Sequence, residues 1–514
     1  MVFSPDSLDI PSGLIFVLYS AHMSPYFSTS FKFFIASVFA PLIVLGAPPT
    51  IANPPAKKAY AIKVKLKGLK DTTCFLAYHM GDKQYLADTA KVDKNGNMEF
   101  EGKEKLQGGI YMVVLPNRKY FEIIVSEQFF AIESDTADLV GKMKVTGTKE
   151  NQLFLDYLGF VQKKGKVIED LGKRLRAQKA NKDSADILRK KLATEEESLN
   201  TYRKGISEAN PTTFMATLMN ALSEPKRPEP PKASNGRPDS VYKFYDQRTH
   251  YFDNINFKDE RILRTPILLA KVKYYTEQMY PQEPDSLNRA CDVVLTKAKA
   301  NKDVFRYLLY TLSNFYETSK FMGMDGVFAH VAGTYYLGKD VDWLDSATKA
   351  KIKDRVGIIT PLLIGKPAPK MVLQDTNGKS VPLYSVKADF MAVIFYDPNC
   401  GHCQKELPRL NGLYRDTLKA KGMEVYAACA ERDPKAWKAF VKKHNLSFIN
   451  GFDKDTVVDF RKYWDVYSYP VLYVLDADKK IVAKRLAVED LNGLVDMMAK
   501  DRDRKKKQET KPKG

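Results

Sequence analysis

A pair of cysteines separated by two residues constrains the fold of this chain more than any other feature. The CGHC motif at 400–403 follows an apolar run at 390–396 and precedes a polar segment at 404–407. This order is typical of a buried strand that leads into a helix. At a helix start the unpaired backbone N–H groups favour a thiolate at Cys400, and Cys403 lies one turn further on. The pattern therefore predicts a thiol–disulfide redox site.

Two features of the motif have alternative interpretations. A CxxC pair is also half of many structural zinc sites, but such a site needs four ligands, and no second Cys or His pair occurs nearby at a suitable spacing. We therefore predict no metal. His402 is either a surface residue at the helix start or a side chain whose dipole and charge stabilise the Cys400 thiolate. A stabilised thiolate makes the pair more oxidising.

The sequence around the motif resembles the thioredoxin-like family, of the redoxin or TlpA type, over residues 363–500. Two prolines support the resemblance: Pro408, five residues after Cys403, and Pro470, just before a late apolar strand. The order of the expected elements agrees as well: a first strand and turn at 364–379, the CxxC helix, a strand at 423–428, a helix at 435–444 and a strand at 471–476. The resemblance implies a C-terminal α/β thioredoxin fold that needs no cofactor.

The same resemblance implies a role for each residue of the site. Cys400 is the nucleophile, Cys403 resolves the mixed disulfide, and the two form the redox-active disulfide. His402 is the third candidate catalytic residue. Tyr469 and Pro470 are the candidate substrate-binding residues, joined by a cis peptide bond that faces the motif.

Several positions depart from the family pattern. Thioredoxins have a buried aspartate six residues before the nucleophile, where this chain has Ile394, and a tryptophan where it has Asn399. Either another acid activates the resolving cysteine, with Glu406 as the nearest candidate, or activation is weaker; Glu406 is also readily explained as an exposed residue. A peroxiredoxin needs a threonine where Asp397 stands, so peroxidase chemistry is a minor alternative.

Three other cysteines are expected to be buried as small apolar side chains: Cys74, Cys291 and Cys429. Cys429 ends a predicted strand, and strand ends in this fold can approach the active site.

Two blocks precede the redox domain. Residues 58–148 alternate as strands do and predict an antiparallel β sandwich, with a hairpin signature at Asp93–Gly96. Residues 149–355 have helical periodicity, interrupted by a proline-rich exposed loop at 224–231. Both blocks resemble uncharacterised domains that accompany thioredoxin modules in exported proteins of the Bacteroidetes. The whole chain is thus expected to have three domains: β sandwich, α-helical middle domain and thioredoxin fold.

The N-terminal region predicts export. Lys32 precedes an apolar run at 33–47 that is short for a membrane span and is soon followed by prolines. We expect a signal or targeting segment over residues 1–52, with Met23 as the more ordinary start and cleavage after Ala52. An uncleaved membrane anchor is the alternative. The expected location is the periplasm or cell envelope of a Gram-negative bacterium.

The formal net charge of +19 is spread along the chain, so no nucleic-acid-binding module is expected. The one dense basic run, in the tail at 501–514, is interpreted first as a solvated end and second as a contact for anionic lipid or an acidic partner.

Taken together, these features predict an exported thiol–disulfide oxidoreductase that acts on client proteins, with a membrane redox partner. The direction of exchange is left open among reduction, oxidation and isomerisation. The alternative from another class is a non-catalytic envelope binding or stress protein in which the redox domain is accessory.

Overall fold

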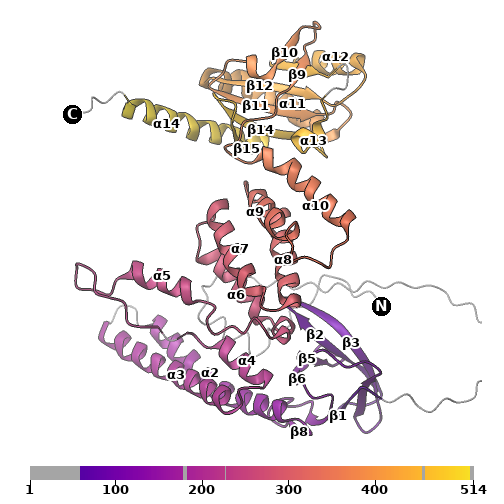
Figure 1. Ribbon diagram of the computed structural model, residues 1–514, viewed down its shortest axis with the longest axis vertical. Helices are drawn as coiled ribbons and strands as arrows, with labels where there is room; N and C mark the ends of the chain where they lie inside the picture. Colours follow the sequence, from indigo (N-terminus) through magenta and orange to yellow (C-terminus); the bar gives the residue numbers. More distant parts are fainter. Residues whose placement is uncertain (1–57, 178–181, 226, 454–457, 510–514) are drawn as a thin grey trace, which may run out of the picture. The chain divides into compact units, whose positions relative to one another are not determined.

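The computed structural model describes residues 58–177, 182–225, 227–453 and 458–509 (Figure 1). The chain divides into two compact units, one of residues 1–280 and 294–308 and the other of residues 281–293 and 309–514. The targeting segment expected at 1–52 lies outside the described residues. Within the described part of the chain, no helix has the length and hydropathy of a membrane span.

The first unit begins with two four-stranded sheets that share one apolar core. One sheet has the order β4-β1-β7-β8 and the other β3-β2-β5-β6. The strands are β1 (Tyr60–Lys67), β2 (Thr72–Met80), β3 (Lys83–Val92), β4 (Asn97–Gly102), β5 (Gly109–Val114), β6 (Tyr120–Val125), β7 (Phe129–Asp135) and β8 (Lys144–Thr146). The expected sandwich is therefore present, but it is not wholly antiparallel, because β1 pairs with β7 in parallel.

The turn of the hairpin expected at Asp93–Gly96 is confirmed, but the pairing of its strands is wrong. A tight turn is present there, closed by the N–H of Gly96 donating to the carbonyl of Asp93 at 3.1 Å. The flanking strands do not pair, however: β3 pairs with β2, and β4 pairs with β1 in the other sheet. The turn is a corner between the sheets because Val92 and Phe100 both point into the core between them.

Helices complete the first unit. Asn151, near the start of the first long helix, exchanges hydrogen bonds with the backbone of Ile124 in β6 at 2.8 and 2.7 Å, which joins the helices to the sandwich. The helices are α2 (Lys149–Ala177), α3 (Lys182–Ala209), α4 (Phe214–Leu222), α5 (Ser240–His250), η1 (Glu260–Arg264) and α6 (Ile267–Gln278). Two further helices have residues in both units: α7 (Pro284–Ala298) and α8 (Lys302–Glu317).

The second unit continues with short helices and ends in a seven-stranded sheet of order β10-β9-β13-β12-β11-β14-β15. Its strands are β9 (Val372–Gln374), β10 (Ser380–Pro382), β11 (Phe390–Tyr396), β12 (Met423–Cys429), β13 (Ile449–Phe452), β14 (Val471–Asp476) and β15 (Ile481–Lys484). Its helices are α9 (Asp325–Val331), η2 (Ala332–Tyr336), α10 (Ser346–Ile359), η3 (Thr360–Leu362), η4 (Leu383–Ser385), α11 (Gly401–Leu413), η5 (Tyr414–Leu418), η6 (Lys419–Lys421), α12 (Pro434–Lys443), α13 (Phe460–Trp464), η7 (Val488–Asp490) and α14 (Leu491–Glu509).

The central strand β11 explains why the motif lies where it does. All of its residues are buried, and they alternate between two apolar cores, one on each face of the sheet. A strand covered on both faces is a continuous apolar run, which is how it stands in the sequence. It pairs in parallel with β12 and antiparallel with β14, so both neighbours help to fix the turn that follows Tyr396.

The basic tail differs from the expected solvated end. Helix α14 continues to Glu509, and Arg502 within it donates to the carboxylate of Asp389 at 2.6 Å and lies over the ring of Phe390. The start of the predicted tail is therefore attached to the redox domain, because its guanidinium finds both an acid and an aromatic face.

Candidate active site

Cys400 is the N-cap of α11, with extended backbone angles of φ −82° and ψ 122°. The turn before it is closed by Asp397, whose carbonyl accepts the N–H of Cys400 at 3.0 Å and whose Oδ1 accepts the N–H of Asn399 at 2.8 Å. The carbonyl of Cys400 accepts the N–H of Gln404 at 3.1 Å. Since the first N–H groups of a helix have no carbonyl partner within it, the positive end of α11 lies at this thiol.

The two cysteines of the motif differ in exposure. Cys400 is half-buried, whereas Cys403 is completely buried in the core on one face of the sheet, and both are free thiols. Burial raises the pKa of Cys403 to about 12, with a smaller contribution from a hydrogen bond to Cys400. The arrangement offers one sulfur to a substrate and holds the other, still protonated, behind it.

Tyr469 and Pro470 lie beside the exposed sulfur. The peptide bond between them is cis, which is the conformation that the resemblance implies. The thiol of Cys400 donates to the carbonyl of Tyr469, with 3.4 Å between sulfur and oxygen. The structure thus brings together Cys400, Cys403 and Tyr469, three of the residues that the sequence singled out. His402 lies on the exposed side of the first turn of α11, and its proposed influence on the thiolate stays a prediction.

The role expected for Glu406, as an acid that activates the resolving cysteine, stays a prediction. The carboxylate of Glu406 lies 3.7 Å from Arg409 on the same helix. The charge of Asp397 instead contributes to raising the pKa of Cys403, after the larger effect of burial, while the backbone N–H of Asp397 hydrogen-bonds the Cys403 sulfur and opposes the rise. In the sequence, Asp397 stands out only as the residue that replaces a peroxiredoxin threonine. Its place in the turn before an N-cap was the available signal.

The two positions that depart from thioredoxin are accommodated differently. Ile394 is fully buried and packs in the same core as Cys403. Asn399, which occupies the tryptophan position, donates from its side-chain amide to the carboxylate of Glu431. A polar bridge between two loops therefore takes the place of an indole ring at the edge of the site.

Cys429 lies close to the same site. It pairs with Tyr396 across β12 and β11, and it hydrogen-bonds the hydroxyl of Tyr396, which also accepts from the indole N–H of Trp437 at 3.1 Å. Cys429 and Cys403 belong to one apolar core, and burial raises the pKa of Cys429 to about 12.

The burial expected for the remaining cysteines is confirmed, since Cys74 and Cys291 are both fully buried and Cys429 is 2% exposed. Among the described residues, no three His, Cys, Asp or Glu side chains converge as a metal site.

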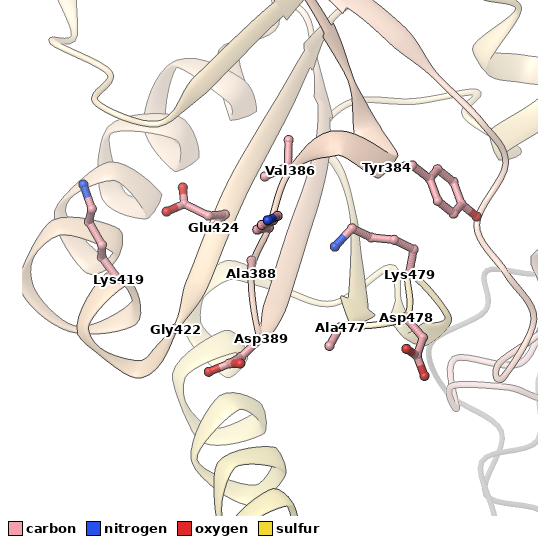
Figure 2. Close-up of a pocket in the computed structure, with 11 residues that line it drawn as sticks. Tyr384, Val386, Ala388, Asp389, Lys419, Gly422, Glu424, Ala477, Asp478 and Lys479 are labelled. Atoms are coloured by element: carbon pink, nitrogen blue, oxygen red, sulfur yellow. The ribbon is translucent and has the colours of Figure 1, made fainter.

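Figure 2 shows a pocket at the other end of β11, where Asp389 leads into the strand. Its volume is about 670 Å³, and both lysines and acids line it. Because the CGHC motif follows the opposite end of β11, this pocket is separate from the candidate active site. The lining residues are Tyr384, Val386, Lys387, Ala388, Asp389, Lys419, Gly422, Glu424, Ala477, Asp478 and Lys479.

Three family models match the chain in separate regions. Residues 364–484 match the AhpC/TSA family. Residues 60–154 match the domain of unknown function DUF4369, and residues 193–360 match the domain of unknown function DUF5106. The first match spans the motif, β14 and the Tyr469–Pro470 pair.

Solved structures are similar to parts of the chain. A domain of a possible thiol-disulfide isomerase from Cytophaga hutchinsonii is 39% identical, with a TM-score of 0.27, over 28% of this chain and 97% of that one. A thioredoxin-like protein from Bacteroides caccae is 18% identical, with a TM-score of 0.42, over 53% of this chain and 99% of that one.

Curated relatives are similar to the C-terminal part of the chain. The thiol-disulfide oxidoreductase ResA of a Bacillus cereus strain is 36% identical over 121 residues, which are 24% of this chain and 68% of the relative. ResA of Bacillus subtilis is 30% identical over 119 residues, 23% of this chain and 64% of the relative. The chain therefore belongs to the thioredoxin-like thiol-disulfide oxidoreductases, the family of the ResA proteins.

Proposed function

We propose that this oxidoreductase exchanges thiols and disulfides with client proteins in the cell envelope, with Cys400 as nucleophile and Cys403 as resolving cysteine. The observation that carries the proposal is the pairing of a half-exposed thiol at a helix N-cap with a buried thiol one turn later. An accessible thiolate favoured by the helix start suits attack, and a shielded second thiol suits resolution.

The reaction proceeds in two exchanges. The Cys400 thiolate attacks one sulfur of a client disulfide, so that the client S–S bond breaks, a bond between Cys400 and the client forms, and one client thiolate leaves. Cys403 then gives its proton to water and attacks the Cys400 sulfur, so that the bond between Cys400 and the client breaks, the Cys400–Cys403 disulfide forms and the second client thiolate leaves. The client gains two electrons and the cysteine pair loses two. The same steps in reverse oxidise a dithiol client.

Tyr469 and Pro470 serve as the substrate-binding residues in this proposal. The carbonyl of Tyr469 lies 3.4 Å from the sulfur of Cys400, so a client strand that pairs with this backbone has its own sulfur beside the nucleophile. His402 adds a positive dipole or charge on the solvent side of the helix start. No cofactor takes part, and a membrane redox partner with a dithiol or disulfide resets the cysteine pair.

We propose an extracytoplasmic location, the periplasm or cell envelope of a Gram-negative bacterium. The apolar run at 33–47 supports it. We also propose that residues 58–148, 149–355 and 363–500 are separate domains, which the separate matches at 60–154, 193–360 and 364–484 support.

Trapping of mixed disulfides tests the proposal. Cys403→Ser in the full chain, expressed in a Gram-negative host and acid-quenched, is expected to accumulate covalent adducts with envelope proteins that dithiothreitol releases. Cys400→Ser/Cys403→Ser is expected to form none, and Cys429→Ser is the matched control that leaves both motif cysteines in place. If Cys403→Ser forms no adduct that depends on Cys400, the redox domain is accessory and the binding-protein alternative holds. Hydrogen peroxide consumption that depends on Cys400 would instead indicate the peroxidase alternative.

A further inference from the structure

A buried carboxylate joins the helical region to the segment that leads into the active site. Asp465 receives a guanidinium from each side: Arg355 of α10 donates to its Oδ1, and Arg485 donates to its Oδ2 at 2.6 Å. Arg355 also lies 3.4 Å from a carboxylate oxygen of Glu317, at the end of α8. Arg355 belongs to the region that matches DUF5106, whereas Asp465 and the motif belong to the AhpC/TSA match.

Asp465 is buried, and both arginines compensate its charge. Asp465 is 6% exposed, and a charge removed from water to that degree is costly unless it is paired and hydrogen-bonded. The side chain of Arg485 is 57% exposed and that of Arg355 is 29% exposed. Arg355, from the helical region, is therefore better shielded from solvent than Arg485. Because less solvent screens its charge, Arg355 interacts more strongly with the Asp465 carboxylate.

Asp465 is four residues before Tyr469, and the chain between them is fixed at two points. At the start, Asp465 ends α13 with a left-handed backbone, and the carbonyl of the preceding Trp464 accepts the hydroxyl of Tyr473 at 2.6 Å. At the end, the carbonyl of Tyr469 meets Cys400. Residues 467 and 468 between these points are exposed, so little packing holds the middle of the segment.

We propose that Arg355 is a positioning residue for client exchange: through Asp465 it holds the segment 465–470 at the place where the Tyr469 backbone meets both Cys400 and a client strand. The inference rests on the proposed function and extends it to the helical region, which would then take part in client recognition without touching the client. Preorganising a binding segment favours association, because less freedom is lost when the client binds.

Two substrates separate positioning from general damage. A protein disulfide such as insulin needs the Tyr469 backbone as well as Cys400, whereas hydroxyethyl disulfide needs only the sulfur. In the full chain, Arg355→Gln is expected to raise KM for insulin by about fivefold or more while the rate with hydroxyethyl disulfide changes by less than about twofold. Arg355→Lys keeps the charge but loses the second donor of the guanidinium, and is expected to raise the insulin KM by about twofold, between wild type and Arg355→Gln. Arg502→Gln, which removes an ion pair with Asp389 at the other end of β11, is the matched control.

The outcomes are distinguishable. Equal losses with both substrates, or an insulin KM unchanged in Arg355→Gln, would overturn the positioning role. If Arg355→Gln unfolds, Arg355→Lys provides the test. A raised insulin KM with an unchanged hydroxyethyl disulfide rate in that variant supports the positioning role, and an insulin KM equal to that of the wild type overturns it. If the wild-type chain shows no Cys400-dependent activity with either substrate, the proposed function itself fails. If the wild-type chain is active and its activity does not change when Arg355 is replaced, only the positioning role fails.

Discussion

The thiol of Cys400 donates to the backbone carbonyl of Tyr469 across 3.4 Å, from the N-cap of α11 to the residue pair that precedes β14. This contact places the accessible sulfur against the backbone of the cis Tyr469–Pro470 pair. Since β11 and β14 are neighbours in the sheet, the strand pairing of the fold fixes the two together. The geometry at the sulfur therefore follows from the sheet rather than from the motif alone.

The difference in burial predicts selective alkylation of one cysteine. With iodoacetamide at pH 7, Cys400 in the reduced protein is expected to react at least about a hundredfold faster than Cys403 or Cys429, because thiolates react and burial raises the pKa of both inner thiols to about 12. Mass spectrometry of the peptides after timed quenching measures each rate. Labelling of Cys403 at a rate near that of Cys400 would show that the inner thiol is accessible.

Replacement of Asp397 is expected to make resolution faster at neutral pH. The negative charge of Asp397 raises the pKa of Cys403, by less than burial does, so Asp397→Asn lowers that pKa and increases the thiolate fraction. Rapid-quench release of a client from the mixed disulfide, followed from pH 6 to 10, is expected to show its pH profile moved to lower pH. Glu406→Gln serves as the control. Slower resolution in Asp397→Asn would mean that the carboxylate acts as a proton acceptor instead.

The hydroxyl of Tyr396 is expected to stabilise the core behind the site. Tyr396→Phe leaves the indole N–H of Trp437 without its acceptor at 3.1 Å and removes the hydrogen bond with Cys429. An unsatisfied buried donor costs about 1–3 kcal/mol. Urea unfolding should show that loss, and Tyr467→Phe, at a tyrosine that is 59% exposed, should change the free energy of unfolding little. Equal effects of the two substitutions would contradict the assignment.

Stability of the reduced protein is expected to fall at alkaline pH. Burial raises the pKa of Cys403 and of Cys429 from 9.0 to about 12, so between these values the unfolded thiols have ionised while the folded ones keep their protons. The folded state then binds more protons, and the free energy of unfolding decreases as pH rises through that window. Urea titrations of the reduced chain at pH 7 and 10 measure the decrease. Cys429→Ala should reduce it, and an unchanged slope in that variant would contradict the burial effect.

Much of the redox domain could be predicted from local sequence. The continuous apolar run of β11 requires cover on both faces, and the CGHC motif after it marks a helix start, so the position of Cys400 followed directly. What the sequence could not reveal was the identity of the acid near Cys403. Asp397 acts on Cys403 through the geometry of the turn before α11, whereas Glu406, the nearest acid after the motif, pairs with Arg409.

Long-range pairing explains the other differences. The turn at Asp93–Gly96 has the composition of a hairpin, but whether its flanks pair with each other depends on β1 and β2, which compete for them from elsewhere in the chain. The ion pairs of Asp465 depend likewise on Arg355, which is 110 residues away in sequence. No local pattern marks either contact.

The most direct test of the account is a redox titration of the motif itself. The full chain is equilibrated with glutathione buffers, quenched and digested with trypsin, which yields one peptide of residues 388–405 that carries both motif cysteines and another of residues 422–432 that carries Cys429. We predict that the first peptide changes reversibly between a dithiol and an internal Cys400–Cys403 disulfide while Cys429 stays reduced. A motif that remains a dithiol at every oxidising ratio, or a disulfide that joins Cys429 to either motif cysteine in its place, would contradict the account.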